Sequence, residues 1–119
     1  MFYDALRNDH GLPNDPFKAL VAPRPIGWIS SLSASGIANL APYSFFNAVA
    51  ESPHYVVSGS GSRKDSLRNL EETGEFAVNL ATWALREAVN ASSIGAPHGF
   101  DEFAHAGLTK IPAVTVKPP

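Results

Sequence analysis

The chain has 119 residues, 45% of them hydrophobic and 17% charged, which fits one globular domain over residues 1–119. A formal net charge of −2 and the lack of a basic stripe argue against nucleic acid or an anionic membrane as the partner. The absence of cysteine excludes disulfides, thiolate nucleophiles and cysteine-bound metals, so electron chemistry would need an organic cofactor or a histidine and carboxylate site.

The N-terminal residues 1–16 are polar and rich in turns, and we expect them to form an irregular lead-in. They lack the basic and apolar regions of a signal peptide, which predicts a cytoplasmic protein. The uncharged span 25–50 is long enough to cross a bilayer, but its prolines, glycines, asparagines and serines exclude a lipid-facing helix. Residues 17–21 are expected to form a short turn or strand.

Short extended segments then follow one another. Residues 26–32 and 37–40 are predicted to be strands joined by a loop of hairpin size. Pro42 has no backbone donor, so the ladder should break there, or the residue should lie at an edge or bulge. The chain should be extended again over 43–49 and over the β-branched segment 54–59.

A helix is predicted over 66–73, with Asp65 as its N-cap and Gly74 at its C′ position. A strand should follow over 75–80. The apolar side chains expected to point inward from it are Phe76, Val78 and Leu80.

In the last third, Thr82 is expected to cap a second helix that ends near Asn90. A loop over 92–100 and a helical turn over 101–106 should follow, and 111–116 resembles the start of another strand. Four to six short strands with short helices around them would be best protected at their edges in a closed or partly closed barrel.

The middle of the chain combines few charges with many hydroxyls and amides. Between Arg24 and Arg63, Glu51 is the only formally charged residue. Burying hydroxyl or amide groups without partners would cost roughly 1–3 kcal/mol each. Either the fold itself satisfies them, or they face a polar, uncharged ligand; we favour a flavin nucleotide as that ligand.

The loop 60–66 joins a predicted strand to a predicted helix. The unpaired amides of a helix start, the helix dipole and the cations Arg63 and Lys64 would together favour a phosphate group. The spacing matches neither a Walker loop nor a dinucleotide fingerprint. The alternative is a solvated loop in which Asp65 is an ordinary helix cap.

Residues 29–31 and 41–47 form a second candidate region. A flavin ring needs an apolar platform and uncharged donors and acceptors along one edge, which the backbone near Pro42, Ser44 and Asn47 would provide. The alternative is a core strand whose aromatic side chains simply pack together.

Other candidate groups are weaker. The four histidines show neither metal-ligand spacing nor a triad pattern, so we predict no metal site and no catalytic residue. Asp101 and Glu102 should cap a helical turn. Arg24, between two prolines, would be either a substrate clamp or part of a structural salt bridge.

Five motifs occur in order, at 23–31, 39–49, 63–69, 72–79 and 101–108. Together they closely resemble the flavin reductase-like family of FMN-binding split-barrel proteins. The resemblance implies a mainly β, Greek-key split β-barrel with short flanking helices, usually a homodimer that holds FMN near the subunit interface.

The resemblance also implies a set of cofactor-binding residues. Those expected along the flavin ring and ribityl chain are Ile29, Ser30, Ser31, Ala41, Pro42, Ser44 and Asn47. Those expected at the phosphate are Ser62, Arg63, Lys64 and Ser66. A further segment expected to approach the flavin consists of Asn90, Ala91 and Ser92.

The implied activity is that of a flavin reductase, in which a hydride passes from NADH or NADPH to the flavin. The alternatives are a flavin-binding electron carrier without NAD(P)H activity and a truncated, non-catalytic fragment. Members of the family usually continue beyond the position of Pro119, so we expect the later barrel strands to be missing here.

Overall fold

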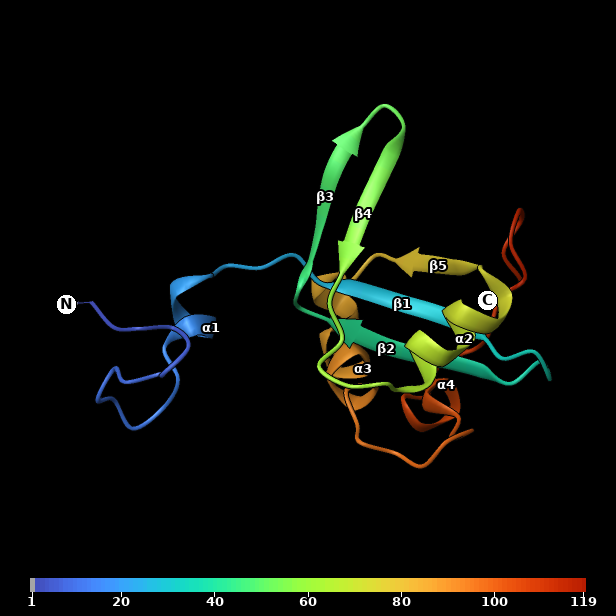
Figure 1. Cartoon of the computed structure of the whole chain (residues 1–119). Coiled ribbons are helices and arrows are strands. Elements are labelled where there is room, and N and C mark those ends of the chain that lie inside the picture. The colour runs from blue at the N-terminus through green and yellow to red at the C-terminus, as the bar shows by residue number, and fades with distance from the viewer. Residues whose placement is uncertain (1) are drawn as a thin grey trace.

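A computed structural model describes residues 2–119 and arranges the strands in two antiparallel sheets (Figure 1). The larger sheet has the order β2-β1-β5, with β1 at Gly27–Leu32, β2 at Ala38–Tyr43 and β5 at Phe76–Asn79. The smaller sheet is a hairpin of β3, Phe46–Glu51, and β4, His54–Ser58. The predicted strands of the first two thirds are thus confirmed, with shifted ends.

The larger sheet is accompanied by the short helices α2 (Asp65–Thr73), α3 (Arg86–Ala91) and α4 (Glu102–His105) and by the 3-10 turn η1 (Trp83–Leu85). The one-turn helix α1 (Phe17–Leu20) lies apart from the sheet, in the N-terminal part of the chain (Figure 1). Helix α2 packs on β1, whereas α3 and α4 lie along β2, on the side of the sheet away from the hairpin (Figure 1). In the part of the chain that the structure describes, no helix is long and apolar enough to cross a membrane.

Side chains of the sheet alternate between two different environments. On one face, Trp28 and Leu40 are almost fully buried and pack with Phe103 from α4. On the other face, Ser31 and Asn39 are hydrogen-bonded to the polar side of α2. The sheet therefore has an apolar core on one face and a polar, charge-free layer on the other.

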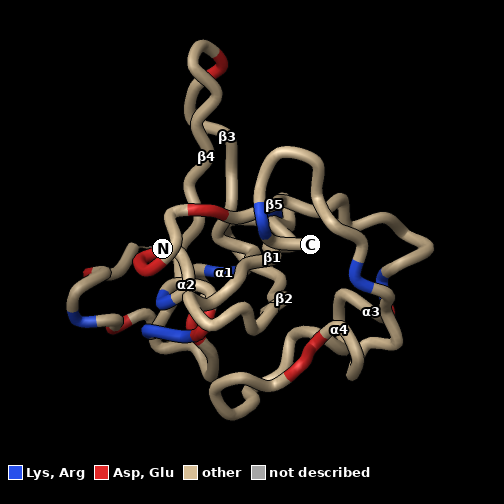
Figure 2. Tube along the Cα trace, turned by 90° about the vertical axis from the view of Figure 1, so that its right-hand side faces the viewer, with Lys and Arg blue, Asp and Glu red and all other residues tan. Residues whose placement is uncertain are grey.

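The β3–β4 hairpin projects from the body of the molecule (Figure 2). Its two strands contain one formally charged residue, Glu51, at the tip of the hairpin. Its base rests on β1, where the Phe46 ring lies against Gly27 so closely that a Cβ atom on Gly27 would overlap it. A β-bulge between Ala48 and Ala50 interrupts the register of the hairpin.

Several expected helix caps differ from those observed. Lys64, not Asp65, occupies the N-cap of α2, and no side chain caps that helix. Asp65 lies in the first turn instead, and its carboxylate is bonded to the segment before α4. Thr82 likewise makes no capping bond. The predicted Gly74 termination is confirmed, because its φ of 69° is left-handed.

Two expectations about strands are wrong. Val78 and Leu80 of the 75–80 segment are 46% and 81% exposed, because the described chain leaves one face of edge strand β5 uncovered. Residues 111–116 form no strand: 111–113 are irregular, and bends begin at Val114. Residues 17–21 contain one turn of helix, and the described strands form no closed ring.

Pro42 and Arg24 also have clear structural roles. Pro42 pairs with Trp28 and lies on β2, an edge strand of its sheet, as its missing donor requires. The Arg24 guanidinium donates to the carbonyls of Lys18 and Val21 and lies 5.7 Å from the centre of the Phe45 ring. It therefore joins α1 to the bend between β2 and β3, and within residues 2–119 it forms no salt bridge.

Candidate functional site

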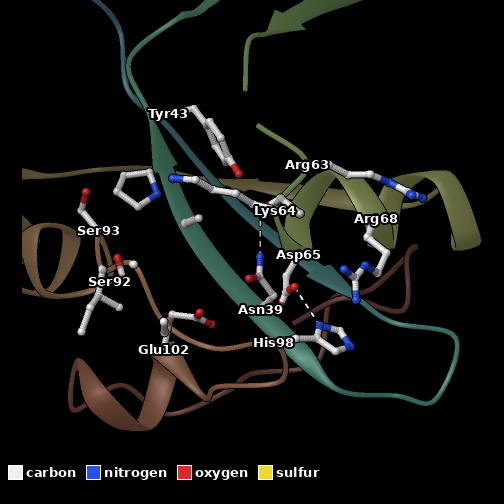
Figure 3. Close-up of a pocket in the computed structure, with 16 residues that line it drawn as sticks. Asn39, Tyr43, Arg63, Lys64, Asp65, Arg68, Ser92, Ser93, His98 and Glu102 are labelled. Atoms are coloured by element: carbon white, nitrogen blue, oxygen red, sulfur yellow. Dashed lines mark hydrogen bonds and ion pairs between the residues drawn. The ribbon is translucent and has the colours of Figure 1, made fainter. Parts of the chain in front are cut away.

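A hollow of about 360 Å³ lies where β2, the start of α2 and the segment between α3 and α4 meet (Figure 3). Its floor is the outer part of β2, from Asn39 to Tyr43. One wall is the helix start 63–66 with Arg68, and the opposite wall is the segment 92–96. His98 and Glu102 lie at one end.

The start of α2 presents free donors to this hollow. The amides of Asp65, Ser66 and Leu67 belong to the first turn, where an α-helix provides no acceptor, and no side chain caps them. The dipole of the nine-residue helix adds partial positive charge at the same place. This geometry suits an anion.

The two adjacent cations of the loop, Arg63 and Lys64, differ in whether they already form an ion pair. Arg63 donates to Glu71 at 2.6 Å, on the outer side of α2. Lys64 instead extends over β2 beside Tyr43 (Figure 3), and among residues 2–119 its ammonium has no ion-pair partner. Lys64 is therefore the loop cation that remains available to a ligand.

A buried chain of hydrogen bonds lies beneath the helix start. Asn39 Nδ2 donates to Ser66 Oγ at 2.8 Å and lies 3.4 Å from Ser31 Oγ. Asn69 Nδ2 donates to the same Ser31 hydroxyl at 3.1 Å. The fold itself thus provides partners for Asn39, Ser31 and Ser66, and these bonds hold α2 and β2 at a set distance, although Asn69 Oδ1 is buried without a hydrogen-bond partner in the described chain.

The hydroxyl of Tyr43 is also buried without a hydrogen-bond partner in the described chain. Tyr43 lines the hollow. Buried polar atoms in folded proteins nearly always have a partner. Tyr43 therefore offers an unused donor and acceptor to whatever enters the hollow.

The structure brings together six of the residues expected to bind the cofactor. These residues, all lining the hollow, are Ala41, Pro42, Arg63, Lys64, Ser66 and Ser92. Ser44 and Asn90 line a neighbouring depression of about 270 Å³, which shares Pro42 and Ser93 with the hollow.

The remaining expected residues lie elsewhere. Ile29 and Ser30 are buried in β1, where Ser30 contacts Asn79 and the carbonyl of Pro119, and Ser31 belongs to the hydrogen-bond chain above. Asn47 lies in the hairpin, and its side chain accepts from the amide of Ala48. Ser62 and Ala91 do not line the hollow.

Two carboxyl groups in the hollow were not expected there. Burial raises the pKa of Glu102, and the nearby Asp65 and Asp101 charges raise it further, although the Leu40 amide donates to it at 3.3 Å. Burial acts against ionisation of Asp65 too, but hydrogen bonds from Gly99 and His98 and the charges of His98 and Arg68 hold its pKa below the ordinary value.

The sequence next to Asp65 and Glu102 does not indicate that these carboxyl groups lie in the hollow, because their hydrogen-bond partners come from distant parts of the chain. Asp65 has the sequence context of a helix cap, and its actual partners lie 33 and 34 residues further along. The motifs themselves include four further lining residues, Asn39, Asp65, Arg68 and Glu102, so the motif positions, and not the local sequence pattern, were the signal that could have found them. No group of three or more histidine, aspartate or glutamate side chains in residues 2–119 is arranged to hold a metal ion.

The fold and the hollow define a small sheet domain that presents free helix amides and an unpaired lysine to an anionic ligand. A family model described as flavin reductase like domain matches residues 20–119, and the chain belongs to that family.

Known proteins with similar sequences and structures agree with this assignment. An uncharacterized protein of Aquifex aeolicus is 39% identical over 105 residues, which cover 84% of this chain and 54% of that protein. The crystal structure of nitrilotriacetate monooxygenase component B from Bacillus cereus is 31% identical, with a TM-score of 0.83, and the match covers 100% of this chain and 62% of that one.

A split barrel domain protein from Shewanella frigidimarina superposes with a TM-score of 0.81 at 16% identity, over 99% of this chain and 62% of that chain, which supports the fold alone. The chain spans about half the length of the curated relatives it matches.

Proposed function

We propose that this chain binds FMN in the hollow beside β2 and acts as a flavoprotein oxidoreductase of the flavin reductase type. The observation that carries the proposal is the uncapped start of α2, with Lys64 beside it, on a chain of the flavin reductase-like family. FMN joins a flavin ring to a terminal phosphate, and this helix start provides the donors that a phosphate needs.

The residues present fit such a ligand. The Ser66 hydroxyl and the first-turn amides would hold the phosphate oxygens, and the Lys64 ammonium would neutralise their charge. The hydrogen bond from Asn39 to Ser66 would fix the distance between the bound phosphate group and β2. The cradle is thus built on a buried network and not on a loop alone.

The ring would lie toward the other end of β2. Ala41 and Pro42 provide an uncharged surface there, the unpartnered Tyr43 hydroxyl provides a hydrogen-bonding group, and the adjoining depression with Ser44 and Asn90 extends that surface. The hollow does not include the predicted contacts Ile29, Ser30, Ser31 and Asn47, since the first three are buried in β1 and Asn47 lies in the hairpin.

Bound FMN would supply the redox chemistry, accepting a hydride from NADH or NADPH and passing electrons to an acceptor. The chain's own residues bind the phosphate, orient the ring along β2 and exclude water from one of its faces. No acid–base residue is required for these tasks, which agrees with the expectation of no catalytic residue. A cytoplasmic homodimer, with the second subunit covering the flavin, is part of the proposal.

The test is to mix the purified chain with FMN, pass it through gel filtration and record the visible spectrum. The proposal predicts that flavin absorbance travels with the protein and that anaerobic NADH or NADPH bleaches it. Retained flavin that neither nucleotide bleaches would favour the electron carrier. Loss of all flavin on the column would contradict FMN binding by this chain.

A further inference from the structure

The segment between α3 and α4, which forms one wall of the hollow, is fastened at both of its ends. At its first end the Ser92 hydroxyl accepts from the buried Trp28 indole at 2.9 Å and donates to the Val89 carbonyl at 3.0 Å. At its far end His98 Nδ1 lies 2.7 Å from Asp65 Oδ1, and the Gly99 amide donates to Asp65 Oδ2 at 3.0 Å.

Between these two anchors the described chain shows backbone hydrogen bonds only near the ends, from the Ser93 amide to the Asn90 carbonyl and from the Phe100 amide to the Pro97 carbonyl. Ser93, Ile94 and Gly95 are exposed and line the hollow together with Ala96. A loop held at two points can move only as far as its anchors allow, so the anchors decide how closely this wall approaches the helix start. The Trp28 anchor is buried, whereas the His98 side chain is 51% exposed.

The position of Asp65 explains why this anchor acts on the hollow. Asp65 belongs to the first turn of α2, next to Lys64 and Ser66, yet both of its carboxylate oxygens are used by residues 98 and 99. One side chain thus joins the phosphate cradle to the opposite wall. Because that carboxylate does not cap α2, the helix amides also stay free.

Resting on the proposed function, we infer that Asp65 is a positioning residue that, through His98 and Gly99, holds the 93–97 wall over the phosphate of bound FMN. The contact forms the closure at the exposed end of the hollow, and FMN leaves when this contact opens. The charged groups that line the hollow around His98 are Arg63, Lys64, Asp65, Arg68 and Glu102.

The experiment measures dissociation rates of FMN and riboflavin from the wild type, Asp65→Ala and His98→Ala by stopped-flow flavin fluorescence. Loss of the His98 hydrogen bond should speed FMN release about fivefold in His98→Ala. Asp65→Ala also loses the bond from the Gly99 amide, so its release should be at least as fast. The double variant should be no faster than Asp65→Ala, and riboflavin release should change little. Lys110→Ala, which breaks the 2.7 Å ion pair with Asp101 outside the hollow, is the matched control.

Rescue by a conservative variant separates positioning from a general loss of structure. His98→Asn keeps a side-chain donor near the position of Nδ1, so it should restore FMN release to near the wild-type rate. Release from His98→Asn as fast as from His98→Ala, with both variants folded, would contradict the positioning role.

The outcomes distinguish this inference from the proposed function. If the wild type binds no FMN, the proposed function fails. If the wild type binds FMN but the Asp65 and His98 variants release it at the wild-type rate, the positioning role is overturned. Tighter FMN binding by Asp65→Ala would also overturn it, since removal of a repelling carboxylate would then outweigh loss of the closure.

Discussion

The Trp28 indole donates a hydrogen bond to the Ser92 hydroxyl at 2.9 Å, across 64 positions of sequence, and joins the centre of β1 to the end of α3. Both residues are at most 3% exposed. Ser92→Ala would leave the buried indole N–H without a partner, at a cost of about 1–3 kcal/mol. Thermal unfolding should report a clear fall in Tm.

Ser93→Ala is the natural control for that variant. Ser93 is the next residue and also lines the hollow, but it is exposed and its hydroxyl makes no hydrogen bond within residues 2–119. Its Tm should stay near that of the wild type. Equal Tm values for the two variants would show that the Trp28–Ser92 bond does not stabilise the fold.

Lys64→Ala should weaken FMN binding about tenfold and riboflavin binding little, because only FMN carries the phosphate that the ammonium would neutralise. Isothermal titration with both flavins at one salt concentration measures the difference. Arg63→Ala is the informative comparison, since its guanidinium is already paired with Glu71 and its loss should matter less. Equal losses for the two flavins would remove Lys64 from the phosphate role.

Glu102→Gln should raise stability at neutral pH. The pKa of Glu102 is raised by burial, so the native state binds its proton more tightly than the unfolded chain. Stability from this group is therefore present at low pH and is lost as pH rises from the ordinary glutamate pKa toward the raised value. Gln removes this loss and keeps an acceptor for the Leu40 amide.

The measurement is the difference in Tm between Glu102→Gln and the wild type at pH 4 and pH 7. The difference should be more positive at pH 7. Glu51→Gln, on the exposed hairpin, should show no such trend. A difference independent of pH would contradict the burial argument.

Gly27→Ala should destabilise the chain, because the new methyl group would overlap the Phe46 ring at the base of the hairpin. The expected cost is about 1–3 kcal/mol. Chemical denaturation of Gly27→Ala, Phe46→Ala and the double variant tests this: the glycine substitution should cost much less once the ring is gone. Gly61→Ala, with nothing within 4 Å of its added Cβ, serves as the steric control.

Local patterns in the sequence predicted most of the individual elements. The strands at 27–32 and 54–58 follow from β-branched and apolar residues between turn signals, and Gly74 ends α2 as expected. The strand expected over 37–40 extends in the structure through Pro42 to Tyr43. The exposed β5 side chains could not be foreseen, because alternation shows that a strand has two faces but not whether a neighbour covers the apolar one.

The candidate site was only partly predictable for a related reason. The helix start at 63–66 and the uncharged β2 segment are local features, and they meet in the hollow as expected. The serines of β1 are instead bonded within the fold, because Asn39, Asn69 and Asn79 provide partners from distant positions. The Asp65–His98 contact likewise depends on tertiary structure that no local pattern encodes.

The most direct test of the account is a crystal structure of the chain with FMN. The account predicts the phosphate within hydrogen-bond distance of the first-turn amides of α2 and of the Lys64 ammonium, with the ring along β2 toward Tyr43. A phosphate bound anywhere else, with the start of α2 still facing solvent, would contradict it.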